Sequence, residues 1–208
     1  MKKYLIITAH PDDAEIAMGG TIMKLVSQGH AIKNFVCSIP NFVELRIKET
    51  ELSSSFMQIE HQFIDHTFPC GVEEISMYYL VSQIDKCIEE FQPDAVFTHW
   101  DQDSHQDHCL VSRAVQIALR RQHFELYFFE QTNQNNLLKS NLFVPNVYVD
   151  ITYYIEKKIQ AVALHRSQLQ GYMKHYLDDI EMLGKWRGYQ IKVQFAESFK
   201  LMNKKEIY

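Results

Sequence analysis

The sequence lacks several features that would mark a special class of protein. It has only four cysteines in 208 residues and no Cys-x-x-Cys pair, so a disulfide framework like that of small secreted domains is not expected. The net charge of −5 argues against a protein that binds nucleic acid through a basic face. No apolar run approaches the roughly 18 residues that a membrane helix needs. The apolar stretch after Lys3 is also too short for a signal peptide. We therefore expect a cytoplasmic protein with reduced thiols, no membrane span and no nucleic-acid partner.

What the sequence does contain is a regular alternation of strand-like and helix-like segments. The length fits a single domain over residues 1–208. Such alternation predicts right-handed crossovers, and hence an open, mostly parallel α/β sheet with helices on both faces. A long surface loop is expected over 131–140 and a frayed tail over 203–207. Strands are expected at 4–8, 31–37, 62–64, 95–98, 126–129 and 147–149, and helices at 15–28, 45–57, 81–91, 108–121 and 154–164.

Two clusters of histidine and aspartate each follow a predicted buried strand. Residues 9–15, Ala-His-Pro-Asp-Asp-Ala-Glu, follow the strand at 4–8. Residues 99–108, His-Trp-Asp-Gln-Asp-Ser-His-Gln-Asp-His, follow the strand at 95–98. Ligands of an open α/β sheet bind beyond the carboxyl ends of its strands. We therefore expect both clusters to meet at one edge of the sheet.

The residue types in these clusters suit a divalent metal ion. Two neutral imidazoles and one carboxylate, with further positions open, are typical of a catalytic zinc site. His10 and Asp13 stand on either side of Pro11 and Asp12, in a turn that lets both side chains point the same way. Pro11 stiffens this turn because it fixes its own φ and biases the preceding residue toward extended backbone. The N-terminus of the following helix adds positive potential where an oxyanion would form.

The clusters hold more acids and imidazoles than three ligand positions require. Asp12, beside a ligand, is the natural general base for a water molecule. Of His105 and His108 one is expected to bind the metal, and the other to protonate or hydrogen-bond the developing oxyanion. Asp107 lies between them and is expected to orient an imidazole. The residues alone leave open which histidine has which role.

The two clusters resemble the signature motifs of the PIG-L/LmbE-like N-deacetylase family. The first motif continues into Gly-Gly-Thr-Ile at 19–22, and Pro-Asp-Ala-Val-Phe-Thr-His at 93–99 leads into the second. Weaker matches follow in the family's order and extend the resemblance over nearly the whole chain. They are Arg46 with Glu49 and the segments 156–158, 165–168 and 196–199.

The resemblance implies a Rossmann-like fold and zinc-dependent removal of an acetyl group from an N-acetylated amino sugar. It implies that His10, Asp13 and His108 bind the metal, which is Zn²⁺ or, as an alternative, Fe²⁺. It further implies that Asp12 is the general base and that His105 is the general acid or the oxyanion-stabilising group.

Two departures from the family pattern concern the substrate. Glu15 comes one position later than in the commonest family form, and 37–44 runs almost directly to Arg46 without the usual Gly-rich, acidic segment. We expect Arg46 to bind a phosphate or sugar hydroxyls through two hydrogen bonds. The alternative is that Arg46 lies on the surface at the start of a helix and pairs with Glu49. Trp100 either stacks on a sugar face or packs against its own loop. The shortened segment leaves the identity of the substrate open.

The sequence thus predicts a deacetylase for a small amino-sugar derivative, such as a nucleotide sugar or a sugar-linked thiol. One alternative is a metal-dependent hydrolase of another amide, an ester or a phosphoester; the last would be supported by a second metal about 3.5–4 Å away. Another is a metal-binding homologue without catalysis, which loss of Asp12 or His105 would have marked. The acyl group and the oligomeric state stay open, including a homo-oligomer in which a neighbouring subunit completes the pocket.

Overall fold

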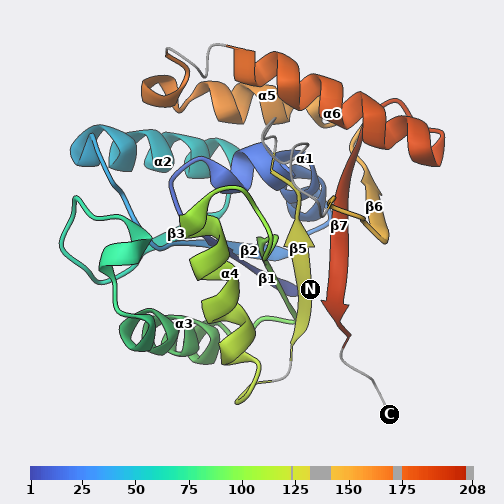
Figure 1. Cartoon of the computed structure of the whole chain (residues 1–208). Coiled ribbons are helices and arrows are strands. Elements are labelled where there is room, and N and C mark those ends of the chain that lie inside the picture. The colour runs from blue at the N-terminus through green and yellow to red at the C-terminus, as the bar shows by residue number, and fades with distance from the viewer. Residues whose placement is uncertain (123, 132–141, 171–174, 205–208) are drawn as a thin grey trace.

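One seven-stranded sheet forms the centre of the protein (Figure 1), in the order β3-β2-β1-β4-β5-β7-β6. The computed structural model describes residues 1–122, 124–131, 142–170 and 175–204. Strands β3, β2, β1, β4 and β5 are parallel neighbours, whereas β7 runs antiparallel to β5 and β6. The strands are β1 (Lys3–Thr8), β2 (Ala31–Val36), β3 (Glu60–Phe63), β4 (Ala95–His99), β5 (Glu125–Phe129), β6 (Val147–Asp150) and β7 (Ala196–Asn203).

Helices cover both faces of this sheet. They are α1 (Asp13–Ser27), α2 (Val43–Met57), α3 (Met77–Phe91), α4 (Gln106–Ala118), α5 (Ile155–Ala163) and α6 (Tyr176–Ile191), with 3₁₀ turns η1 (Val72–Glu74) and η3 (Arg166–Gln168). Helices α3 and α4 pack on one face, and α1, α2 and α5 pack on the other. Helix α6 lies farther out, against α5 and β7. The predicted Rossmann-like α/β fold is confirmed.

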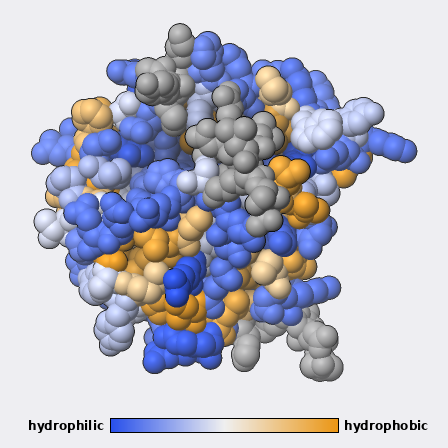
Figure 2. All heavy atoms as spheres, viewed as in Figure 1, coloured by the Kyte–Doolittle hydropathy of each residue, from blue (hydrophilic) through white to orange (hydrophobic). Residues whose placement is uncertain are grey.

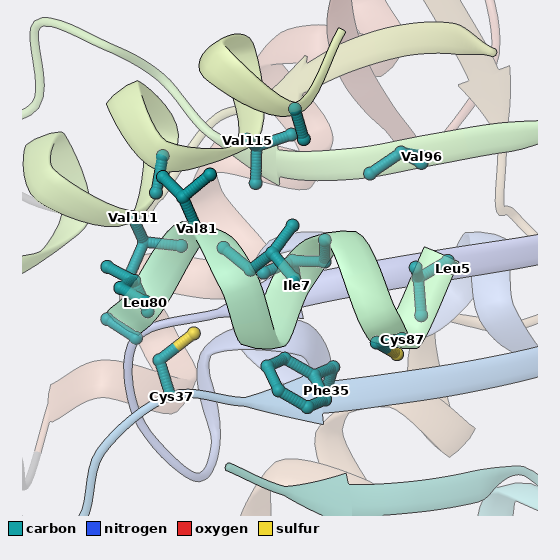
Figure 3. Close-up of a cluster of buried hydrophobic side chains, with 14 of the residues drawn as sticks. Leu5, Ile7, Phe35, Cys37, Leu80, Val81, Cys87, Val96, Val111 and Val115 are labelled. Carbon is teal, nitrogen blue, oxygen red and sulfur yellow. The ribbon is translucent and has the colours of Figure 1, made fainter. Parts of the chain in front are cut away.

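The side chains of β1 alternate between two hydrophobic cores. Leu5 and Ile7 belong to the core under α3 and α4, and Ile6 belongs to the core under α1. Figure 3 shows Ile7 near Val81 of α3 and Leu5 near Cys87 of the same helix. A strand with both faces buried is expected to be apolar at every position, as residues 5–7 are. This packing fixes where the chain leaves the sheet after β1.

Helix α1 is bent in its middle. Met18 has non-helical dihedrals, φ −142° and ψ 23°. The N–H groups of Gly20 and Thr21 donate to the carboxylate of Glu197 in β7, at 3.0 and 2.6 Å. Lys158 of α5 donates to the same carboxylate at 2.6 Å. Glu197 therefore caps the second half of α1 from outside, and the first half is a separate short helix.

The sequence located strands β1 to β6 and helices α1 to α5 within a few residues but missed α6 and β7. The missed strand β7 pairs antiparallel with β5 and β6, and the missed helix α6 packs against it. Both bury charged side chains, Arg187 in α6 and Glu197 in β7. Residues 132–140 of the predicted loop and 205–207 of the predicted tail lie outside the described residues. Asn203, expected to begin the tail, still belongs to β7.

The surface of the described residues and the state of the cysteines can be compared with what the composition predicts. Within the ranges given above, no helix is long and apolar enough to cross a membrane. Hydrophilic side chains cover most of the face seen in Figure 2, and hydrophobic ones form separate areas. All four cysteines are free thiols; Cys37, Cys70 and Cys87 are buried, and Cys109 is half-buried.

Candidate metal centre

The two clusters meet because β1 and β4 are direct neighbours. The strands are parallel, with Ile7 opposite Thr98, so the segments that follow them leave the sheet at the same edge. The backbone N–H of Ala9 donates to His99 Nε2 at 2.9 Å and ties the two segments together. The structure therefore places both predicted clusters at one sheet edge.

His10, Asp13 and His108 are all buried, and each offers a ligand atom within 4.8 Å of the others. Asp13 lies between the two imidazoles: its Oδ2 is 3.6 Å from His10 Nδ1, and its Oδ1 is 3.4 Å from His108 Nε2. A second group, His10, His105 and Asp107, also meets the 4.8 Å limit and shares His10. In that group His10 Nε2 is 3.0 Å from Asp107 Oδ2. Both groups have the nitrogen and oxygen donors that zinc takes in catalytic sites.

Asp13 is held in place and kept charged. Its Oδ2 accepts the backbone N–H of His10 at 2.8 Å, which closes the turn across Pro11. Burial opposes the charge of this carboxylate, but His108 and His99 hold the pKa of Asp13 well below its usual range. A buried carboxylate that stays anionic is suited to bind a metal ion.

His108 is fixed from its far side by Asp103, which the sequence analysis did not single out. Asp103 Oδ2 lies 3.3 Å from His108 Nδ1, so Nε2 is the nitrogen directed at Asp13. Burial opposes protonation, yet the two carboxylates raise the pKa of His108 to about 10. A carboxylate on the second nitrogen is the usual support of a metal-binding histidine. The sequence could have identified Asp103 as a candidate, because this residue lies within the second His/Asp cluster.

Asp12 occupies a strained position directly beside this group. Its φ of 91° is in the left-handed region, and its side chain makes no capping hydrogen bond to α1. Such strain often collects at functional sites. Burial raises the pKa of Asp12 to about 6, against the opposing effect of Arg46. A pKa close to the operating pH is what general-base catalysis favours.

His105 carries its proton on the nitrogen that faces away from its own helix. Its Nδ1 accepts the backbone N–H of Asp107 at 3.2 Å, which leaves the proton of the neutral ring on Nε2. Burial and the neighbouring His108 lower the pKa of His105. Its ring centroid lies 4.9 Å from that of His10 and 4.5 Å from that of His108. His105 is thus a neutral hydrogen-bond donor beside both imidazoles.

Of the expected substrate contacts, only Arg46 lies against the site. It is 3% exposed and donates from Nη2 to Pro11 O at 2.8 Å and to Asp12 Oδ1 at 3.4 Å. The alternative surface pair with Glu49 is wrong, because Glu49 instead accepts from the Ser167 backbone and hydroxyl at 2.8 and 2.5 Å.

Trp100 lies inside the hydrophobic core. It is 3% exposed and makes an edge-on contact with Phe143, with 5.6 Å between the ring centroids. This burial favours the packing alternative that the sequence left open. A sugar face stacked on this indole would need the core around Phe143 to open.

Glu15, one position later than expected for the family, is also buried. It accepts from Ser53 Oγ of α2 at 2.6 Å and lies 3.1 Å from His165 Nε2. Burial disfavours its charge, but His165 and Ser53 lower the pKa of Glu15. Glu15 therefore joins α1 to α2 and to the segment before η3.

Two further side chains touch the predicted ligands His108 and Asp13, and the sequence did not single them out. The ring of His99 stacks on His108 at 3.9 Å between centroids, and burial together with His108 lowers the pKa of His99 to about 4. Gln131, at the end of β5, donates to Asp13 Oδ1 at 3.2 Å. His99 stands in the second motif, whereas nothing in the local sequence marks Gln131. Only the neighbouring position of β5 and β4 in the sheet brings it there.

A family model described as PIG-L, GlcNAc-PI de-N-acetylase, matches residues 5–119, which is more than half of the chain. The chain belongs to the PIG-L family. It is similar to the probable N-acetyl-α-D-glucosaminyl L-malate deacetylase 2 of Bacillus cereus, with 25% identity over 193 residues that cover 83% of this chain and 86% of the relative.

Solved structures share the PIG-L fold. The N,N′-diacetylchitobiose deacetylase of Pyrococcus horikoshii has a TM-score of 0.81 and 22% identity, covering 97% of this chain and 84% of that one. The 4-carboxy-2-hydroxymuconate hydratase of Pseudomonas putida has a TM-score of 0.82 and 18% identity, covering 100% and 99%. The same fold thus hosts a deacetylase and a hydratase, so the fold alone does not select a reaction.

Proposed function

We propose that this PIG-L family protein is a metal-dependent deacetylase that removes the N-acetyl group from an amino-sugar derivative. The main support is the convergence of His10, Asp13 and His108 with Asp12 and His105 beside them. Further support comes from the family description and from the relative in Bacillus cereus, which is described as a deacetylase of an N-acetylglucosaminyl compound.

His10, Asp13 and His108 would hold the metal, Zn²⁺ in the first place and Fe²⁺ as the alternative. Their donors are two imidazole nitrogens and a carboxylate, and the buried carboxylates of Asp12 and Asp103 add negative charge around them. This donor set fits a borderline divalent cation better than Ca²⁺ or Mg²⁺, which prefer oxygen ligands. When bound, such an ion polarises a carbonyl oxygen and makes water more acidic.

Asp12 is the group that takes the proton of the attacking water. As the water oxygen bonds to the acetyl carbon, the carbonyl becomes an oxyanion, and the N–H at His105 Nε2 donates to it. When the C–N bond breaks, the proton held by Asp12 passes to the departing amine. Acetic acid and the free amine of the sugar are then released, and Asp12 is again a carboxylate. The acid ionises to acetate by giving its proton to the amine or to solvent. The raised pKa of Asp12, about 6, suits a group that must both accept and return a proton.

Three neighbours hold these groups in their working positions. Asp103 fixes the ring of His108 through Nδ1, and Asp107 contacts His10 Nε2. Arg46 anchors the strained turn through Pro11 O and lies against Asp12. We keep Arg46 as a proposed substrate contact, because its Nε has no hydrogen-bond partner within the described part of the chain. For Trp100 we propose a packing role only.

The test is release of free amine from N-acetylated sugars, nucleotide sugars and sugar-linked thiols. Each substrate is incubated with the Zn²⁺-loaded protein, with the Fe²⁺-loaded protein and with a chelated sample of the same preparation. We expect metal-dependent amine release from one substrate class. No release from any of them, with one metal bound per chain, would move the substrate outside N-acetyl sugars and overturn this proposal.

A further inference from the structure

Helix α6 carries an apolar stripe on its outer face, consisting of Met182, Trp186 and Tyr189. These residues are 67%, 55% and 77% exposed. Their spacing of four and three positions places them on one side of the helix. Trp186 and Tyr189 have nearly parallel rings, with 6.3 Å between centroids. Figure 1 shows α6 as an outer helix, with α5 and the sheet on its inner side.

The apolar stripe contributes nothing to the protein's own core. The side of α6 that packs inward buries Ile180, Gly184, Arg187 and Gly188. A β-carbon on Gly188 would lie 2.7 Å from Val193 O, so this face is adapted to close backbone packing. A surface helix normally turns its large apolar residues inward. Helix α6 turns Ile180 inward, but the three residues of the apolar stripe point outward, which indicates a partner for the outer face.

The size of the exposed surface fits a protein interface. The apolar stripe offers on the order of 400 Å² of side-chain surface. A stable complex buries about 800 Å² on each partner, with an apolar centre and a polar rim. Tryptophan, tyrosine and methionine are the residue types enriched at such centres. Beside the helix lies a hollow of about 530 Å³ lined in part by Tyr153, Ile159 and Phe195.

The charges along one flank of the apolar stripe change sign from end to end. The N-terminal half carries Asp178 and Glu181, and the C-terminal half carries Lys185 and Lys192. Asp178 is 81% exposed at its side chain, and Lys192 is also exposed. An antiparallel copy of the same helix would set the acidic end of one against the basic end of the other. The flank is therefore complementary to itself, as a two-fold interface requires.

We propose that α6 is the interface of a homodimer in which two copies of α6 pack antiparallel about a two-fold axis that passes between Lys185 and Trp186. In this register Met182 of one copy faces Tyr189 of the other, and the two Trp186 side chains meet at the axis. Asp178 of each copy faces Lys192 of its partner. Lys185 comes close to the axis but is neutralised by its own Glu181, 2.6 Å away.

The first test measures the mass of the full-length protein in solution by sedimentation equilibrium over a range of concentrations. We expect a dimer, and we expect Trp186→Glu to raise its dissociation constant roughly a thousandfold, because each dimer loses two central aromatic side chains. The matched control is Leu52→Glu on α2, a residue 58% exposed and outside the interface, which should leave the dimer intact. A monomeric wild-type protein, or loss of association in the control but not in Trp186→Glu, overturns the proposal.

The second test addresses the antiparallel register. Asp178→Lys and Lys192→Asp should each weaken the dimer, because like charges then face each other across the axis. The double variant exchanges the two charges and should recover most of the wild-type affinity. Asp is suited to position 192, where φ is 63°. A double variant as weak as the sum of the single variants overturns the register. Circular dichroism melting of all variants shows whether each remains folded.

Discussion

The parallel half of the sheet and its antiparallel edge have different roles. The parallel half carries the candidate site, and the edge stabilises the fold. Strands β1 and β4 lead into the candidate metal centre, and Gln131, two residues after the end of β5, contacts Asp13. The antiparallel edge, β7 and β6, supplies none of the proposed ligands. It supplies buried charges that hold the parallel half in place, since Glu197 of β7 caps the second half of α1.

A second buried charge pair repeats this supporting role. Arg187 of α6 donates from Nε and Nη2 to Glu130, which directly follows β5, at 2.7 and 2.6 Å. Ser198 of β7 donates to the same carboxylate at 3.0 Å. Buried pairs of this kind strongly destabilise a protein when one partner is removed. The comparison therefore predicts that substitutions in the parallel half change the chemistry, and that substitutions in the edge change the stability.

The largest effect is expected for His108→Ala, which removes a proposed ligand. Metal content measured by elemental analysis and amine release should both fall to background. Circular dichroism should show a folded protein, because the parallel core does not depend on this side chain. A variant that still binds one equivalent of zinc and turns over substrate would point to the group of His10, His105 and Asp107 instead.

Next in size is Asp12→Asn, which keeps a residue type that tolerates left-handed backbone. Loss of the general base should lower the turnover number by about a hundredfold or more. Metal content should be unchanged. The variant should be at least as stable as the wild type, because burial disfavours the charged carboxylate that it replaces. Wild-type turnover in this variant would contradict the assigned role.

In the antiparallel edge, Glu197→Gln should lower the free energy of unfolding by about 3–5 kcal/mol, because Lys158 is left buried without a counter-charge. Urea unfolding measures the change, and the folded fraction should keep most of its turnover. The double variant with Lys158→Met removes the uncompensated charge and should recover much of the loss. If Glu197→Gln abolishes turnover in fully folded protein, the division between the two regions is wrong.

The smallest effect is expected for Asp103→Asn, which acts on the metal only through His108. Metal affinity, measured by competition with a chelator, should fall about tenfold to a hundredfold. At saturating metal the turnover should recover most of its wild-type value. Equal affinity in wild type and variant would remove Asp103 from the metal centre.

The fold of the parallel half was predictable because burial on both faces makes a strand apolar throughout, as in residues 5–7 of β1. Strand β7 was missed for the opposite reason, although its neighbour β6 was predicted. Glu197 interrupts a strand whose neighbours are buried, and it is itself buried only because Lys158 and α1 satisfy it. Helix α6 turns Trp186 outward and Arg187 inward, so its hydrophobic pattern does not follow the protein's own core.

The same contrast applies to the site. The pattern around His10 and His108 indicated a metal centre, because motif residues at the ends of neighbouring strands share one sheet edge. The contact from Gln131 could not be predicted, since it depends on where β5 ends relative to Asp13. Arg46 was placed on the surface in one alternative, yet the structure buries it against Pro11 and Asp12. The local sequence cannot predict that a polar side chain is buried when the groups that hydrogen-bond to it come from another element.

The most direct measurement is an anomalous difference map from a crystal of the zinc-loaded protein, recorded on both sides of the zinc absorption edge. One strong peak bounded by His10, Asp13 and His108 is the predicted result. A peak between His10, His105 and Asp107 instead, or no peak in protein with full zinc content, would contradict the proposed ligand set and the roles built on it.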